Sequence, residues 1–128
     1  MKKLTLILLA VMLLTACGQD KENDKGAVYM NITVEEAKRI MDNEEGYIIL
    51  DVREQDEYDA GHIPGAILIP YTQIAEKAEE VLTDKDQLIL VYCRSGRRSK
   101  IAAEALVELG YTNIKEFGGI IDWPYEVE

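Results

Sequence analysis

One short apolar run that ends in a cysteine constrains the fold of this chain more than any other feature. Leu88–Cys93 is followed by a polar loop, and Lys100–Leu109 then repeats its apolar residues at helical spacing, up to Gly110. The expected inward face of that helix consists of Ile101, Ala102, Ala105, Leu106 and Leu109. A continuous apolar run is typical of a strand buried in a parallel sheet, and glycine commonly follows a helix end. The stretch therefore predicts a strand, a tight loop and a helix, with a thiol at the carboxyl end of the strand.

The loop after this strand brings positive charge close to the thiol. Arg94, Arg97 and Arg98 follow Cys93 within five residues, and Gly96 permits backbone conformations that a side chain would block. Because a helix N-terminus adds free N–H groups and the positive end of its dipole, we expect the pKa of the Cys93 thiol to be depressed. The same field attracts an anionic substrate to the sulfur. The alternative is a buried structural cysteine before a solvated basic turn.

The first residues of the chain have the composition of an export signal. Met1–Lys3 is basic, and Leu4–Leu14 is apolar apart from one threonine and too short to span a bilayer as a helix. With Leu-Thr-Ala directly before Cys17, the segment resembles a bacterial lipoprotein signal. That resemblance implies removal of residues 1–16 and attachment of lipid, such as palmitate, to Cys17. An ordinary secretory signal cut nearby and an uncleaved anchor are the alternatives.

This interpretation divides the chain into a signal peptide (1–16), a lipid anchor with a flexible tether (17–26) and one domain (27–128). The domain would lie on the extracytoplasmic side of the cell membrane, with Cys93 as a lone thiol. A net charge of −10 argues against a nucleic-acid partner. One histidine and two cysteines are too few for a dedicated zinc or iron–sulfur site, so we expect no metal and no other cofactor.

Strands that alternate with helical segments predict an α/β fold, with a central, mostly parallel sheet and helices on both faces. The expected strands are Ala27–Ile32, Tyr47–Val52, Ile67–Ile69, Leu88–Cys93 and Ile114–Phe117. Four helices are expected. The first runs from a Thr33–Glu36 capping box to about Asp42, and the second covers Gln55–Ala60. The third runs from a cap at Thr72 to Leu82, with Ile74, Ala78, Val81 and Leu82 inward, and the fourth covers Lys100–Leu109. Gly118–Gly119 is expected to be a turn, and Trp123 a packing residue.

Three further polar residues are candidates for chemistry. Asp51 and Arg53 lie at the carboxyl end of a predicted strand, where α/β folds place their sites, although a structural charge pair or a helix cap is the commoner role there. His62 is the only histidine and a candidate general base. Because it lies in a turn rich in glycine and proline, we favour a hydrogen-bonded structural histidine.

Taken together and in order, these motifs resemble the single-domain rhodaneses, a family of sulfurtransferases. The resemblance covers roughly residues 28–125. It is carried by a first signature, an active loop and a closing signature: Asp51-Val52-Arg53 with Glu57-Tyr58 and Gly61–Ala66, then Cys93–Arg98, then Gly118-Gly119 with Trp123.

The resemblance implies a cycle of sulfur transfer. The Cys93 thiolate would take the outer sulfur of an anionic donor such as thiosulfate, and the persulfide would pass it to cyanide, a thiol or a protein acceptor. Loop N–H groups would hold the persulfide, Arg94 and Arg98 would bind the donor, and Arg97 would add only to the general positive field. The implied substrate-binding residues are Arg94, Ser95, Gly96, Arg97, Arg98 and Ser99. We expect a monomer.

Two other functions remain open on the sequence. Phosphatases and arsenate reductases related to this fold also place a cysteine in an anion loop, but they need an arginine six positions after it, where this chain has Ser99. Tyr92 also stands where those phosphatases usually have histidine. The second alternative is a module that binds or senses a sulfur species without turnover.

Overall fold

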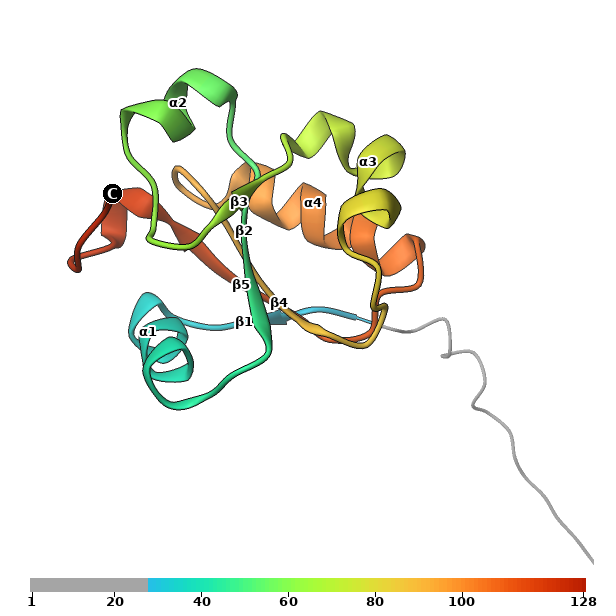
Figure 1. Cartoon of the computed structure of the whole chain (residues 1–128), viewed down its shortest axis with the longest axis horizontal. Helices are drawn as coiled ribbons and strands as arrows, with labels where there is room; N and C mark the ends of the chain where they lie inside the picture. Colours follow the sequence, from blue (N-terminus) through green and yellow to red (C-terminus); the bar gives the residue numbers. More distant parts are fainter. Residues whose placement is uncertain (1–27) are drawn as a thin grey trace, which may run out of the picture.

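The computed structural model describes residues 28–128, which form one sheet of five parallel strands (Figure 1). The strand order is β1-β5-β4-β2-β3, so β4 lies between β5 and β2. The predicted signal peptide, Cys17 and the tether lie outside the described residues. The strands are β1 (Met30–Asn31), β2 (Tyr47–Asp51), β3 (Ile67–Leu68), β4 (Leu88–Cys93) and β5 (Ile114–Gly119).

Helices cover both faces of this sheet. Figure 1 shows α3 and α4 side by side on one face, with α1 on the other. The prediction of a parallel α/β sheet with helices on both faces is therefore confirmed. None of the helices in the described part of the chain is long and apolar enough to cross a bilayer. The helices are α1 (Val34–Asn43), α2 (Gln55–Ala60), α3 (Ile74–Val81) and α4 (Arg97–Glu108), with 3-10 turns at Tyr71–Gln73 and Ile120–Asp122.

The two faces of β4 supply two separate parts of the core. Ile89, Val91 and Cys93 pack with the residues of α3 and α4, whereas Leu90 and Tyr92 pack with those of α1. This alternation follows from the pleat of a strand, which points successive side chains to opposite faces. Cys93 therefore belongs to the α3–α4 side of the molecule. Trp123 is buried on the α1 side, as a packing residue.

Several element ends differ from the sequence-based prediction. Thr33 caps α1 as expected, by accepting the N–H of Glu36, but the Glu36 side chain pairs with Arg39 instead of completing the capping box. Thr72 caps no helix: it lies in a 3-10 turn after Pro70, and α3 begins at Ile74. Proline favours such a turn because its φ is already fixed near the helical value.

The predicted inward faces are partly wrong. Val81 at the end of α3 is 50 % exposed and Ile101 in α4 is 40 % exposed, whereas Ala103, which was not expected inside, is fully buried. The buried residues of α4, Ser99, Ala102, Ala103 and Leu106, recur at helical spacing, so its inward face is centred on the two alanines. The helix also begins at Arg97, three residues earlier than predicted. β5 is likewise longer than predicted, because Gly118 and Gly119 continue it instead of forming a turn.

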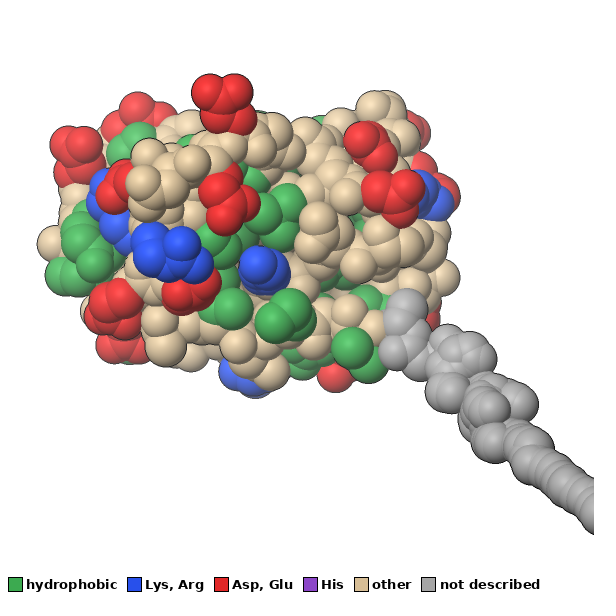
Figure 2. All heavy atoms as spheres, turned by 90° about the horizontal axis from the view of Figure 1, so that it is seen from below, with side chains coloured by type: hydrophobic (Ala, Val, Ile, Leu, Met, Phe, Trp, Pro, Cys, Tyr) green, Lys and Arg blue, Asp and Glu red, His purple; other side chains and the backbone are tan. Residues whose placement is uncertain are grey.

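The acidic side chains of the described residues lie mostly on the surface. Figure 2 shows acidic side chains scattered over one face, with a few basic and hydrophobic groups between them. Within residues 28–128 the buried polar or charged residues are Asp51, Arg53, Ser99 and Glu116. Because a charge is costly to bury unless it is paired, these residues indicate where the fold has special polar arrangements.

Candidate active site

Cys93 lies at the junction of three elements. It is the last residue of β4, it lies opposite Gly119 of β5, and the first turn of α4 begins four residues later at Arg97. The register of β4 and β5 shifts between Val91 and Cys93, so the strand is irregular where it delivers the thiol. Only 1 % of Cys93 is exposed. The thiol is therefore buried beneath the loop that follows it.

Hydrogen-bond donors converge on the Cys93 sulfur. The backbone N–H of Gly96 donates to Sγ at 3.0 Å, and Sγ lies 3.4 Å from Ser99 Oγ. Burial by itself would raise the pKa of the thiol. Hydrogen bonds from the Ser99 side chain and from the backbone N–H groups of Ser99, Gly96 and Ser95 outweigh that effect and lower it. This lowered pKa agrees with the expectation from the sequence, and the thiolate is the form of cysteine that acts as a nucleophile.

Two glycines permit the loop to close over the sulfur. Gly96 adopts a φ of +119°, a conformation that L side chains rarely take. Gly119 allows β5 to touch the loop backbone: a Cβ there would lie 1.9 Å from the carbonyl oxygen of Arg94 and 2.4 Å from the nitrogen of Ser95. The Arg94 carbonyl also accepts the N–H of Ile121 at 3.1 Å. The closing Gly-Gly motif therefore fixes the position of the loop.

Arg98, which was predicted to bind the donor, is held by a carboxylate from α2. Its Nη1 and Nη2 donate to Glu57 Oε1 and Oε2 at 2.8 and 3.0 Å. The hydrogen bonds from Arg98 hold the pKa of Glu57 down at about 2, against burial, which raises it. The arrangement is a two-pronged pair that fixes the plane of the guanidinium. The Glu57 carboxylate therefore compensates much of the positive charge of Arg98.

The other two arginines of the loop face outward. Arg94 and Arg97 are both exposed, and the Arg97 guanidinium lies 5.8 Å from the ring centre of Tyr71. Within residues 28–128 neither takes part in a side-chain ion pair like that of Arg98. The field at the mouth of the loop therefore comes from these two side chains, together with Lys100 in the same turn of α4.

Ser99 and Glu116 form a buried polar contact beside the sulfur. Ser99 was predicted among the substrate-binding residues, but its side chain is buried, with Oγ 2.5 Å from Glu116 Oε2 and 3.0 Å from the carbonyl oxygen of Gly96. Glu116 was not among the predicted site residues. Its one signal in the sequence is an acidic residue at an otherwise inward position of a strand, two residues before the Gly-Gly motif.

Asp51 and Arg53 form the predicted structural pair. Arg53 Nη2 donates to Asp51 Oδ2 at 2.7 Å and to the carbonyl of Gly61 at 2.7 Å. The Tyr92 hydroxyl donates to the same Asp51 oxygen at 2.7 Å and accepts the N–H of Ile63. Burial, the largest cause, and the hydrogen bond to Asp51 raise the pKa of Tyr92. These groups satisfy one another and leave none directed at a substrate.

His62 has the contacts of a structural residue. Its Nδ1 lies 2.9 Å from the carbonyl oxygen of Tyr58, and its ring stacks on the Tyr58 ring with centres 3.7 Å apart. Its backbone exchanges two hydrogen bonds with Glu128, and Nε2 lies 3.4 Å from the Glu128 carboxylate. His62 is thus engaged with α2 and the C-terminal residue.

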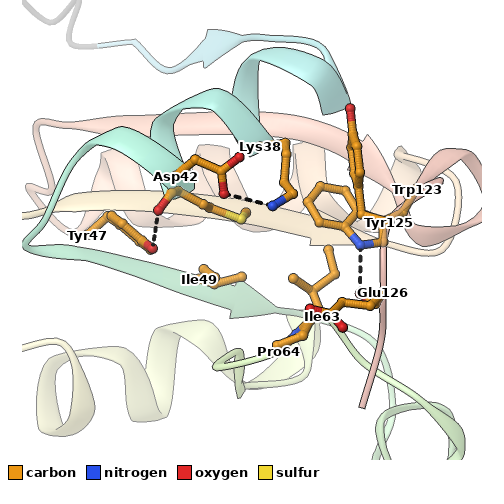
Figure 3. A pocket seen from close by; sticks show the side chains of 10 residues that line it. Lys38, Asp42, Tyr47, Ile49, Ile63, Pro64, Trp123, Tyr125 and Glu126 are labelled. Atoms are coloured by element: carbon orange, nitrogen blue, oxygen red, sulfur yellow. Dashed lines mark hydrogen bonds and ion pairs between the residues drawn. The ribbon is translucent and has the colours of Figure 1, made fainter.

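A pocket of about 180 Å³ lies on the α1 side of the sheet (Figure 3). Its charged lining groups include Lys38, which donates to Asp42 at 2.7 Å and lies 5.4 Å from the ring centre of Tyr125. Since these groups pair with one another and Cys93 belongs to the opposite side, the pocket is separate from the thiol. It is lined by Lys38, Met41, Asp42, Tyr47, Ile49, Ile63, Pro64, Trp123, Tyr125 and Glu126.

Known proteins share this arrangement of sequence and fold. The family model "Rhodanese-like domain" matches residues 33–124. Thiosulfate sulfurtransferase PspE of Escherichia coli is 40% identical over 73 residues, which cover 57% of this chain and 70% of that protein. A sulfurtransferase of Allochromatium vinosum is 35% identical over 88 residues, 68% of this chain and 79% of that protein. The chain matches 60% of the length of YrkF of Bacillus subtilis, at 34% identity.

A solved structure gives the same answer for the fold. A rhodanese-related protein of Thermoplasma volcanium superposes with a TM-score of 0.68 at 32% identity, over 78% of this chain and 98% of that one. The residues that match the family model contain every strand from β2 to β5, the helices α1 to α4 and the loop after Cys93. With its all-parallel sheet, its loop and these relatives, the chain belongs to the family of rhodanese-like domains.

Proposed function

We propose that this protein is a sulfurtransferase that carries sulfane sulfur on Cys93 and takes it from thiosulfate or a related anionic donor. The observation that carries the proposal is the hydrogen bond from the Gly96 N–H to Cys93 Sγ at 3.0 Å, at the N-terminus of a helix and beneath exposed arginines. A sulfur anion is stabilised there before any substrate arrives. Relatives named as sulfurtransferases support the same chemistry.

The proposed cycle has two displacements at sulfur. The Cys93 thiolate attacks the outer sulfur of thiosulfate, a sulfur–sulfur bond forms, and sulfite leaves with the electron pair of the broken bond. An acceptor, either cyanide or a thiolate, then attacks the outer sulfur of the persulfide and releases the Cys93 thiolate. No proton is consumed in either step. Because only 1 % of Cys93 is exposed, the donor sulfur has to enter the loop to reach Sγ.

The arginines of the loop divide the work of binding the donor. Arg94 and Arg97 are exposed and free of carboxylate partners among the described residues, so they would attract the dianion and contact its oxygens. Arg98 is bound to Glu57, which fixes the position of its guanidinium. In this proposal Arg98 stabilises the anion on Cys93, and its own pKa is raised chiefly by Glu57 and also by the charge of Cys93.

The intact mass of the purified domain, residues 27–128, tests the proposal. We expect thiosulfate to add one sulfur atom and cyanide to remove it, and Cys93→Ser to show neither change. A rate of sulfur transfer to cyanide that is equal in wild type and Cys93→Ser would overturn the proposal. Stable sulfur on Cys93 without turnover would indicate the alternative module, which senses a sulfur species.

A phosphatase activity has less support. The position six residues after the cysteine is Ser99, which is buried and turned toward Glu116, so it offers no cation to a phosphate. Release of phosphate from an aryl phosphate by wild type, but not by Cys93→Ser, would favour that activity over sulfur transfer.

We further propose that the protein is exported and anchored to the cell membrane by lipid on Cys17, with the domain on the extracytoplasmic side. The support is the basic, apolar and Leu-Thr-Ala-Cys sequence of the first residues. The test is labelling of growing cells with a fatty acid that carries a clickable tag. Label should appear in the wild-type membrane fraction and be absent in Cys17→Ala. Equal label in both would contradict lipidation at Cys17.

For the soluble domain we propose a monomer, which light scattering tests directly.

A further inference from the structure

Glu116 is a buried acidic group that the proposed cycle does not use. Only 2 % of it is exposed, and it reaches the active-site sulfur through one side chain, Ser99. Cys93 Sγ lies 3.4 Å from Ser99 Oγ, which lies 2.5 Å from Glu116 Oε2. Sulfur, hydroxyl and carboxyl therefore form one continuous chain of hydrogen-bonding atoms between β4, α4 and β5.

The number of protons in this chain limits its charge states. Two contacts, Sγ to Oγ and Oγ to Oε2, each need one proton between their heavy atoms to be hydrogen bonds. The Ser99 hydroxyl supplies one, and the carbonyl oxygens of Gly96 and Gly118, at 3.0 and 3.3 Å from Oγ, are further acceptors within its reach. The second proton sits on Cys93 when the sulfur is a thiol, and it must sit on Glu116 when the sulfur is a thiolate. A thiolate together with a carboxylate would leave one of the two contacts without a proton.

More backbone N–H groups donate to the sulfur than to the carboxyl at the other end of this chain of contacts. Backbone N–H groups of Ser95, Gly96 and Ser99 donate to the sulfur at the N-terminus of α4. The charge of the sulfur also acts on the Arg98 guanidinium, which is already paired with Glu57. Around the Glu116 carboxyl lie the N–H of Gly118, which donates to Oε2 at 2.9 Å, and Lys100 Nζ at 3.9 Å from Oε1. Lys100 is half exposed, so water weakens its effect. The phenol of Tyr29, the residue before β1, is close enough for the two groups to interact, and burial is the largest cause of its raised pKa.

We propose that Glu116 holds the proton that Cys93 gives up, with Ser99 as the bridge, so that the resting site is a thiolate beside a neutral carboxylic acid. In the transfer the S–H bond breaks and a proton joins Ser99 Oγ, while the Ser99 proton moves to Glu116 Oε2. Ser99 then donates to the sulfur and accepts from Glu116. One negative charge is kept throughout, on the sulfur instead of the carboxyl. Glu116 is a positioning residue, since it acts on the sulfur through Ser99. The inference rests on the proposed function in one respect: sulfur transfer is the reaction for which the thiolate would be needed.

Alkylation of Cys93 with a neutral reagent, iodoacetamide, tests the inference without any sulfur donor. Near neutral pH the wild type should lose the ultraviolet absorbance of its thiolate and release one proton for each Cys93 alkylated. The proton comes from Glu116, which ionises once the neighbouring negative charge is gone. The measurement combines absorbance with a pH indicator in weak buffer, and Cys93→Ser sets the background of both signals.

The variants isolate the source of the proton. Glu116→Gln should lose the same absorbance and release none, whereas Glu104→Gln, an exposed change on α4, should behave as wild type. Three results would overturn the inference: a wild-type thiolate alkylated without release of a proton, no thiolate absorbance in wild type, or one proton from a thiolate in Glu116→Gln. Should Glu116→Gln fail to fold, the wild-type result decides alone. Because thiosulfate is not used, proton counts that contradict the inference leave the sulfurtransferase proposal standing. A protein that transfers no sulfur can still give the expected proton counts.

Discussion

The ends of β2 and β4 lie next to each other in the sheet, with Asp51 paired in register with Tyr92, yet they hold opposite kinds of polar site. At the end of β2, Asp51 and Arg53 are buried and neutralise each other. At the end of β4, donors surround the sulfur of Cys93 while two arginines of the loop face outward. A polar residue at the carboxyl edge of a parallel sheet is therefore not by itself a sign of reactivity. The difference lies in whether its field is cancelled inside the protein or directed at a ligand.

The largest effect on stability should come from breaking the internally cancelled site. Arg53 is only 5 % exposed, and Asp51→Asn would leave its buried guanidinium without a counter-charge. Removing one partner of a buried ion pair costs about 3 to 5 kcal/mol of unfolding free energy. Denaturant unfolding followed by Trp123 fluorescence measures it. Asp59→Asn, a change at an exposed carboxylate of α2, serves as control, and equal stability of the two variants would contradict the prediction.

The second prediction concerns the contact between β5 and the loop. In Gly119→Ala the new Cβ would lie 1.9 Å from the carbonyl oxygen of Arg94, so the loop backbone has to move. We expect a loss of about 1 to 3 kcal/mol in unfolding free energy, as for other overpacked sites. The sulfur transfer that we propose should fall by more than about tenfold, because the hydrogen-bond donors around Cys93 are displaced.

Gly46→Ala is the matched control for this variant. Gly46 also has a positive φ, of +80°, but a Cβ there meets nothing within 4 Å, and it lies before β2 at the amino end of the sheet. The control should lose stability and keep its rate of sulfur transfer. A Gly119→Ala protein with the wild-type rate would show that the close contact does not position the loop.

The general plan of the fold could be predicted from the sequence because it depends on patterns. The apolar run of β4, the capping threonine of α1 and the glycine after α4 are local signals that packing did not override. The start of α4 was placed too late because Arg97, Arg98 and Ser99 carry no apolar periodicity. They are helical because the preceding Gly96 turns the chain, and this effect of backbone geometry is not visible in a hydrophobic pattern.

The candidate site was only partly predictable for a similar reason. Cys93 and its arginines follow one another in the sequence, and a motif reveals them. The partners that set their charge come from elsewhere: Glu57 lies in α2 and Glu116 in β5. Which of the arginines is already paired depends on the packing of α2 against the loop. No spacing rule within the loop contains that information.

The Glu57–Arg98 pair predicts how stability depends on pH. Since its folded pKa of about 2 lies below the ordinary value of 4.5, the stability that Glu57 contributes is present above pH 4.5 and is lost as pH falls toward 2. The pair is half-buried, so we expect a contribution of about 1 to 2 kcal/mol. Between pH 4.5 and pH 2, Glu57→Gln should therefore lose about 1 to 2 kcal/mol less unfolding free energy than the wild type. Thermal unfolding of both proteins across the interval measures it, and parallel pH profiles would contradict the prediction.

The smallest effect should come from the histidine. Because His62 is engaged with Tyr58 and Glu128, it belongs with the internally satisfied groups of the β2 side. His62→Gln should cost about 0.5 to 1.5 kcal/mol of unfolding free energy, the usual net value of one hydrogen bond. The rate of sulfur transfer should change by less than about twofold, under about 0.5 kcal/mol in activation free energy. Rates measured across the titration range of histidine give the answer. A tenfold loss together with a flattened pH profile would make His62 a general base, and the boundary between the two strand ends would then have to be drawn elsewhere.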